Sequence, residues 1–279
     1  MLQVSPSGYY AWRKRLRKPP SPRRKSLKQL VRDCYFENRR RYGSRRIKEA
    51  LVKNAIKIGR SQVRVLMKEE GLKAIQCKAF KPKTTNSKET NASPNLLANI
   101  ELKECASTKI IIGDITYIRL RGGKFCYLAI WQDKVTRRII GWSLELEMTA
   151  ELVISALQKA IRKDLIKAGA IVHSDRGSQY ASNSFRELLR RNGFRQSMSG
   201  KGNCYDNAQA ESFFSRFKAE LIEGGVFEDI EQARSEIFSY IEGYYNRVRL
   251  HSSLGYKSPI EFEQELQTKN AGGKRQFIV

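Results

Sequence analysis

The sequence predicts an α/β protein in which helices cover a mixed β-sheet, preceded by a basic helical region and followed by a long helix. Three observations predict this class. Residues 109–146 consist of β-branched and aromatic runs separated by short turns, helical periodicity follows them, and most of the net positive charge lies in the N-terminal third. With 279 residues, of which 41% are hydrophobic, the chain is long enough to bury a substantial core.

Residues 1–77 have the pattern of short basic helices. Ser21 followed by Pro22 predicts one helix start, and two further helices, opening at Ser44 and Ser61, are separated by Gly59. Two short helices joined through a glycine-containing turn are typical of a helix-turn-helix, although an ordinary helical hairpin fits the periodicity equally well. The basic setting favours DNA binding. The candidate DNA contacts are the arginines of these two helices, Arg45, Arg46, Arg60 and Arg64.

Charge is the strongest global signal. The chain carries 53 Lys and Arg against 28 Asp and Glu, and residues 1–90 alone hold 26 against 6. Twenty of the 25 net positive charges therefore lie in the first third of the chain. A polyphosphate is the usual partner of such a field, because each neutralised phosphate releases counterions. A ribosomal-type or merely soluble basic surface is the alternative that charge alone leaves open.

The sequence also predicts the compartment. No run of 18 apolar residues is present, and the first residues lack the charged and apolar regions of a secretory signal. The five cysteines are scattered and never in C-x-x-C spacing, and only two histidines are present. These counts argue against a zinc site, and we expect a reducing cytoplasm.

The remaining chain is predicted to form the core. Residues 78–108 are expected to be an extended, exposed linker, because their first part is rich in Lys, Thr, Ser and Asn. The predicted elements after the linker are strands at 109–120, 124–133 and 137–146, a helix at 149–165, a strand at 170–175 and a helix at 182–193. This β-β-β-α-β-α order is the skeleton of a ribonuclease-H-like fold, which we assign to residues 109–225. A helix at 229–246, with a capping box at Asp229, is expected to complete the core within residues 226–265, and 266–279 to form a flexible tail.

Two aspartates occupy unusual positions in the predicted strands. Asp114 lies in the middle of the apolar run IIIGDITYI, where an unpaired carboxylate is costly to bury, so it requires a cation or several donors. Asp175 ends the strand IVHSD, at the kind of sheet edge where ligand-binding residues gather. His173 shares a strand face with Asp175 and is a candidate to orient DNA or a metal-bound water, with an ordinary hydrogen-bonded strand histidine as the alternative.

The stretch SGKGNCYDNAQAESFFSRFK places two carboxylates at the entry of an apolar helix. At about 100° per residue, Glu211 shares a polar stripe with Ser215 and Lys218 beside the buried face. Asp206 lies about 140° away from Glu211 and stands where an N-cap belongs, so we assign Asp206 to capping and Glu211 to chemistry. Asn207 either steadies Glu211 or belongs to the first helical turn.

Asp114, Asp175 and Glu211 therefore form a candidate metal site. Hard oxygen ligands on rigid elements suit Mg²⁺, and two such ions about 3.5–4 Å apart can activate the attacking and leaving oxygens of a phosphodiester. Lys218, on the Glu211 face, is expected to reach a DNA phosphate. The alternative is three unrelated surface acids among the 28 Asp and Glu residues.

Four motifs in order make the chain resemble a known family, and they are DITYI, HSDRGSQY, SMSGKGNCYDNAQAESFFSRFKAEL and YYNRVRLHSSLGYKSPIEFE. Together with SPSGYYAWRKR and RYGSRRIKEAL upstream, they resemble the OrfB transposase of the third bacterial insertion-sequence family, with its retroviral-integrase-like core. The resemblance covers about residues 5–265. It implies that Asp114, Asp175 and Glu211 are a DD(35)E triad and that Lys218 is the basic residue seven positions after the glutamate.

The resemblance also implies a mechanism and partners. Two Mg²⁺ ions, or Mn²⁺, activate water to nick the element end, and the freed 3′-hydroxyl attacks another phosphodiester without a covalent protein–DNA intermediate. The expected partners are the terminal inverted repeats, target DNA, further copies of the chain on DNA and an upstream leucine-zipper-bearing OrfA-type protein, in a bacterial cytoplasm at the nucleoid. The sequence departs from the family in lacking the tryptophan that often stands shortly before the first aspartate.

Three other functions remain possible from the sequence. A ribonuclease-H-type or junction-resolving nuclease usually arranges four carboxylates, and a helix-turn-helix repressor leaves most of the chain unexplained. The third is a catalytically inactive or domesticated DNA-binding derivative, for which loss of a triad carboxylate is the expected sign. The presence of all three carboxylates favours an active transposase.

Overall fold

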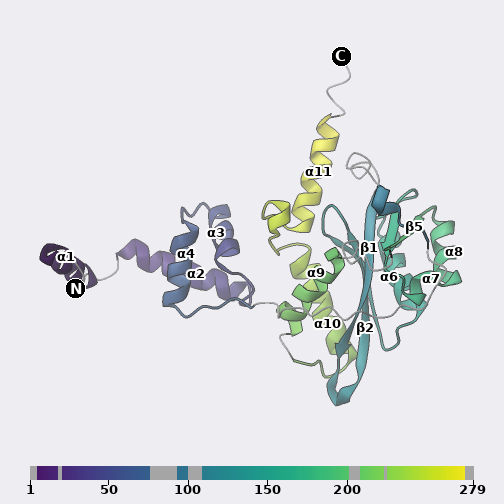
Figure 1. Ribbon diagram of the computed structural model, residues 1–279, viewed down its shortest axis with the longest axis horizontal. Coiled ribbons are helices and arrows are strands. Elements are labelled where there is room, and N and C mark those ends of the chain that lie inside the picture. The colour runs from purple at the N-terminus through teal and green to yellow at the C-terminus, as the bar shows by residue number, and fades with distance from the viewer. Residues whose placement is uncertain are drawn as a thin grey trace. The chain divides into compact units, whose positions relative to one another are not determined.

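The computed structural model describes residues 5–17, 21–75, 93–99, 109–200, 208–222 and 225–273. It divides into two compact units, Met1–Ile75 and Gln76–Val279, which are described separately (Figure 1). No helix in these described ranges is long and apolar enough to cross a membrane. Asp206, which we assign to capping from the sequence, and Asn207 lie outside the described residues.

The first unit consists of four helices, α1 (Pro6–Arg17), α2 (Pro22–Glu37), α3 (Ser44–Lys53) and α4 (Arg60–Glu69). Ser21 caps α2 as predicted, because its hydroxyl accepts the Arg24 amide at 3.3 Å. Gly59 precedes α4, so this helix begins one residue before the predicted start at Ser61. Apolar side chains at helical spacing on α2, α3 and α4 form the core of the unit, which includes Leu27, Val31, Ile47, Leu51, Val63 and Leu66.

The second unit contains a five-stranded sheet in the order β3-β2-β1-β4-β5. Its strands are β1 (Ile110–Arg119), β2 (Phe125–Asp133), β3 (Ile139–Glu145), β4 (Ile171–Ser174) and β5 (Arg195–Met198). The first three form the predicted antiparallel meander, and β4 and β5 extend it in parallel. The fifth strand is missing from the prediction. Its four residues, RQSM, carry no alternating apolar pattern, so only pairing with β4 makes this segment a strand.

Helices cover both faces of this sheet (Figure 1). One face packs on α6 (Ala150–Arg162), α7 (Ser178–Ala181) and α8 (Asn183–Arg191) around the fully buried Trp131. The other face packs on α9 (Ala208–Phe217), its π-helical continuation η3 (Lys218–Ile222), and α10 (Ile230–Phe238) with its π-helical continuation η4 (Ser239–Tyr245). Asp229 caps α10 as predicted, with its Oδ1 accepting the Gln232 amide at 2.8 Å.

Two segments differ from the prediction. Helix α11 (Pro259–Gly273) continues through residues 266–273, which the sequence analysis assigns to a flexible tail. It begins at a capping box that the sequence does contain, in which Ser258 Oγ accepts the Glu261 amide at 3.3 Å and Glu261 Oε2 accepts the Ser258 amide at 2.8 Å.

Within the predicted linker, Ser93 and Asn95–Leu97 are half-buried rather than exposed. The 3₁₀-helix η1 (Leu96–Asn99) begins beside β5, where the Leu96 amide donates to Ser197 Oγ at 3.0 Å and Ser93 Oγ donates to Gln196 Oε1 at 2.8 Å. The segment therefore covers the outer edge of the sheet, which otherwise presents unpaired backbone groups.

Candidate active site

Asp114 and Asp175 lie in one row of the sheet. The parallel register pairs Ile112 with His173, an offset of 61 positions, and the same offset relates Asp114 to Asp175, which directly follows β4. Neighbouring strands are about 4.8 Å apart, so this register, continued by two residues, would place the two backbone positions side by side. Asp114 also pairs with Ile130, which packs under α9 and α10, so both aspartates belong to the face that α9 covers.

The position of Asp114 is fixed by the residue before it. Gly113 lies against the Trp131 ring, and a Cβ atom added to Gly113 would fall 2.4 Å from the ring carbon Cζ3. The indole fills the opposite face of the sheet and donates its N–H to the Val153 carbonyl at 3.1 Å. Asp114 is half-buried, and its Oδ1 accepts the Ile115 amide at 2.9 Å. Close packing on one face therefore holds the carboxylate-bearing residue on the other.

Asp175 begins the loop RGSQY. Its Oδ1 accepts the Gly177 amide at 3.0 Å. Loss of surrounding water raises the pKa of Asp175 above the ordinary aspartate value, and the Gly177 hydrogen bond opposes this rise. The residue as a whole is exposed. Tyr180 lies close to both aspartates: burial raises the pKa of its phenol, and the charges of Asp175 and Asp114 add to the effect.

Glu211 stands in the first described turn of α9. The helix is anchored by Ala210, Phe213, Phe214 and Phe217, which are buried against the sheet, and this leaves Glu211 exposed as the predicted stripe requires. Within the described ranges, no group of three Asp, Glu, His or Cys side chains is close enough to hold a metal ion. In the described structure, the side chains of Asp114, Asp175 and Glu211 therefore do not stand together at ligand distance.

Lys218 and Ser215 are both half-buried on this side of the sheet. Lys218 Nζ lies 4.5 Å from the centre of the Tyr117 ring, a cation–π contact. Burial lowers the pKa of Lys218, and the charge of Asp114 raises it. Lys218 is thus close enough to the first aspartate to feel its charge, although it packs on an aromatic ring rather than extending into solvent.

A buried ion pair supports the helix that carries Glu211. Glu220, in η3, forms a bidentate pair with Arg249, with a shortest distance of 2.7 Å from Arg249 Nη2 to Glu220 Oε1, and both side chains are 4% exposed. The Tyr240 hydroxyl donates to Glu220 Oε2 at 2.9 Å. This network ties the end of α9 to η4 and to the loop after it. Our prediction does not include this network, although the sequence contains a signal for it. Glu220 falls three residues after the buried Phe217 on the apolar stripe, so its carboxylate is expected to be buried and to require a cation as partner.

His173 has a structural role. The residue is fully buried, with Nδ1 2.8 Å from Ser197 Oγ and Nε2 3.2 Å from Ser199 Oγ. Both ring nitrogens are used within the protein, which favours the hydrogen-bonded strand histidine, and the role in orienting DNA or water stays a prediction.

In the first unit, Arg45, Arg60 and Arg64 are exposed. Arg60 and Arg64 are one turn apart on α4 and so share a face of the helix. Arg46 is half-buried, donates to the Arg41 carbonyl at 3.4 Å and packs over Tyr42 with its guanidinium carbon 5.6 Å from the ring centre. Three of the four predicted arginines are therefore exposed to solvent. The fourth, Arg46, contacts the segment that connects α2 to α3.

Models of known domains match the chain in three places. The integrase core domain model matches residues 106–204, a second integrase core domain model matches residues 192–259, and the HTH-like domain model matches residues 22–80. These matches confirm the ribonuclease-H-like core and resolve the choice between a helix-turn-helix and an ordinary hairpin in favour of the former. A solved structure of the HTLV-2 integrase catalytic core domain in complex with magnesium also aligns, with 17% identity and a TM-score of 0.40, covering 55% of this chain and 94% of that one.

Curated relatives cover most of the chain. The transposase for insertion sequence element IS904 of Lactococcus lactis is 41% identical over 86% of this chain and 94% of the relative. Transposase InsF for insertion sequence IS3A of Escherichia coli is 36% identical over 95% of this chain and 92% of the relative. The order of the motifs, the fold of the sheet that carries them and the sequence identity to these relatives all indicate the same family. The chain belongs to the transposases of the third bacterial insertion-sequence family, which are DDE-type polynucleotidyl transferases.

Proposed function

We propose that this transposase cuts DNA at the ends of its element and transfers the freed strand with Asp114, Asp175 and Glu211 as its catalytic carboxylates. The observation that supports the proposal is the register between β1 and β4, because its continuation by two residues would put the two aspartates side by side on the face covered by α9. Glu211 is exposed in the first turn of that helix, and the Phe213 side chain two residues later anchors it.

The donors suit a hard divalent cation. Carboxylate oxygens on a strand, a strand end and a helix are the ligand type that Mg²⁺ or Mn²⁺ prefers, and a cation beside Asp175 would offset the cost of its desolvated charge. Asp114 and Asp175 would hold two such ions, with Glu211 as the third ligand. When bound, the ions supply an acidified water and neutralise charge on the phosphodiester. Because the described structure holds no group of three such side chains at ligand distance, the proposal requires the three carboxylates to come closer together when metal binds.

The chain itself supplies position and charge. Attack of water on phosphorus at the element end breaks the P–O3′ bond and frees a 3′-hydroxyl. That hydroxyl attacks a second phosphodiester and expels its 3′-oxygen, so one P–O bond breaks for each one formed. Lys218 would place its ammonium on the phosphate near Asp114, and Ser215 would hydrogen-bond to the backbone on the same side. Neither step requires a side chain as base when the attacking oxygen is oriented and its charge stabilised.

The remaining parts are assigned to DNA recognition and assembly. The exposed arginines of α3 and α4, Arg45, Arg60 and Arg64, would contact the terminal repeats, with Arg46 near them. We propose that the chain works as a homo-oligomer on DNA in the bacterial cytoplasm, at the nucleoid. An upstream leucine-zipper-bearing OrfA-type protein, or a frameshift fusion to it, would add recognition of the element ends.

Strand transfer with purified chain, labelled element-end DNA and Mg²⁺ tests this proposal. We expect joined product from the wild type and a loss of about a thousandfold or more for Asp114→Asn, Asp175→Asn and Glu211→Gln. Asp164→Asn is the matched control, because its carboxylate is 78% exposed and forms an ion pair with Lys167 three residues on. Melting curves of all variants establish that each is folded.

The outcomes separate the alternatives. Full activity in Asp175→Asn contradicts the carboxylate assignment. A wild-type chain that binds element ends but never cuts them, even with Mn²⁺ and the upstream protein added, identifies the inactive derivative. Activity that appears only when the upstream protein is added would mean that the chain alone does not recognise the element ends.

A further inference from the structure

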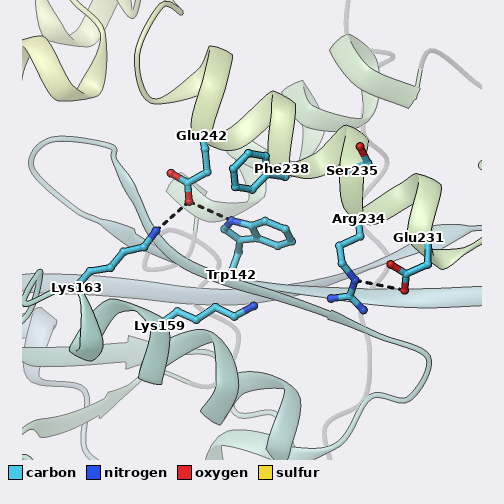
Figure 2. A pocket seen from close by; sticks show the side chains of 8 residues that line it. All are labelled: Trp142, Lys159, Lys163, Glu231, Arg234, Ser235, Phe238 and Glu242. Carbon is cyan, nitrogen blue, oxygen red and sulfur yellow. Dashed lines mark hydrogen bonds and ion pairs between the residues drawn. The ribbon is translucent and has the colours of Figure 1, made fainter.

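A hollow lies at the outer edge of the sheet, beside β3. Its volume is about 490 Å³, and Figure 2 shows α6 below it and α10 with η4 above it. It is lined by Trp142 of β3, by Lys159 of α6 with Lys163 directly after that helix, by Glu231, Arg234, Ser235 and Phe238 of α10, and by Glu242 of η4.

The hollow is separate from the aspartates. The register pairs Trp142 with Ile130 and Ile130 with Asp114, so Trp142 is two strands away from Asp114 in the same row. Two strand spacings correspond to about 10 Å between the backbones. Helices α9 and α10 pack on the sheet face over this row, and the hollow opens at the far edge from Asp175.

Aromatic side chains form its floor and rim. Trp142 is 8% exposed, and its indole N–H donates to Glu242 Oε1 at 3.3 Å. Phe238 is 59% exposed at the rim (Figure 2). An exposed ring beside a fixed indole offers an apolar surface to a sugar or a base.

The cations outnumber the carboxylates that can meet them. Lys163 Nζ is paired with Glu242 at 3.3 Å, and Arg234 Nε is 3.7 Å from Glu231 Oε1. Lys159 Nζ contacts the Trp142 ring, 5.1 Å from its centre, and in the described part of the chain it has no hydrogen bond or ion pair to a carboxylate. Glu231 and Glu242, the two carboxylates of the hollow, are thus paired with other side chains, and the Lys159 ammonium lies over the face of the indole ring.

Charge repulsion makes this arrangement receptive to an anion. Burial lowers the pKa of Lys159 most, and the positive charges of Arg234, Arg162 and Lys163 lower it further, against an opposing effect of Glu145. An anion between Lys159 and Arg234 would remove the repulsion between them and replace water around a half-buried ammonium.

We propose that this hollow binds a phosphate of a DNA backbone between Lys159 and Arg234, with the adjoining sugar or base against Phe238. We choose DNA as the anion because the chain belongs to a family of transposases and carries a net charge of +25. The site gives the enzyme a DNA contact outside its proposed carboxylates, and it does not depend on their assignment. A bound duplex would then contact the protein at the edge of the sheet as well as at the proposed catalytic carboxylates.

The salt dependence of binding to a short DNA duplex of random sequence tests the proposal. Loss of one phosphate contact reduces the slope of log K against log salt by about 0.9. We expect Lys159→Gln and Arg234→Gln each to lower the slope by about that amount, and Lys159→Arg to keep it. Arg190→Gln is the matched control, because it removes one exposed charge, paired with Glu187, far from the hollow in the sequence and on another helix.

Three results would overturn the proposal. The first is an unchanged slope in both glutamine variants, with melting curves showing that they are folded. The second is a reduction equal to that of Arg190→Gln, which would mean that only net charge matters. The third is loss of self-association by sedimentation with unchanged DNA binding, which would assign the hollow to a protein partner.

Discussion

The substitution Arg249→Met tests how the core of the second unit holds α9 in place. Arg249 is 3% exposed, and its guanidinium forms a bidentate pair with Glu220. Methionine has nearly the length of the arginine stem and no charge, so the substitution removes the cation while filling much of its space. Glu220 is then left as a buried carboxylate whose remaining side-chain donor, among the pairs described above, is the Tyr240 hydroxyl.

The expected cost is large. Removing one partner of a buried ion pair costs about 3–5 kcal/mol, because the other charge stays desolvated. In a domain of this size each kcal/mol lowers the melting temperature by roughly 2–4 °C, so we expect a fall of roughly 6–20 °C. Replacing both partners with methionine removes the unpaired charge as well, and buried pairs replaced in this way are often neutral. We therefore expect Glu220→Met/Arg249→Met to be more stable than Arg249→Met by at least about 2 kcal/mol.

Urea unfolding followed by tryptophan emission measures these differences. Trp131 is fully buried in the second unit, and a Trp12→Phe background removes the signal of the first unit. Arg190→Met serves as the surface control, since its pair with Glu187 is exposed, and we expect little change. If Arg249→Met costs under 1 kcal/mol, or if the double variant is no more stable than the single one, the buried pair does not stabilise this region as argued.

Two further predictions concern the aspartates. Gly113→Ala places a methyl group against the Trp131 ring and should cost about 1–3 kcal/mol in urea unfolding, whereas Gly243→Ala, with open space around its added carbon, should cost nothing; equal effects would contradict the close packing described here. Asp175→Asn in metal-free buffer should raise the melting temperature at pH 7, because a carboxyl whose pKa is raised on folding destabilises the fold when ionised. This gain should disappear as pH falls from the raised value to below the ordinary aspartate pKa of about 4, and a gain that persists at low pH would point to another cause.

Sequence patterns predict most of the elements because their physical basis is local. Runs of β-branched and aromatic residues predict β1, β2 and β3, and caps at Ser21 and Asp229 predict helix starts that the structure confirms. The capping box at Ser258 is equally local, so the sequence does contain the start signal of α11, although our prediction places no helix there. In contrast, β5 exists through its neighbour: Arg195–Met198 pairs with β4 and carries no pattern of its own.

The sequence by itself determines which carboxylates are candidates, because their residue types, their places on strands and helix and their spacing are all written in it. Only the tertiary structure decides which of them meet, because contact depends on strand register and helix packing between distant segments. The register between β1 and β4 relates Asp114 to Asp175, and the packing of α9 on the same face decides how far Glu211 lies from them. The same long-range packing buries Glu220 with Arg249, occupies both nitrogens of His173 with serines and gathers Lys159 and Arg234 at the edge of the sheet.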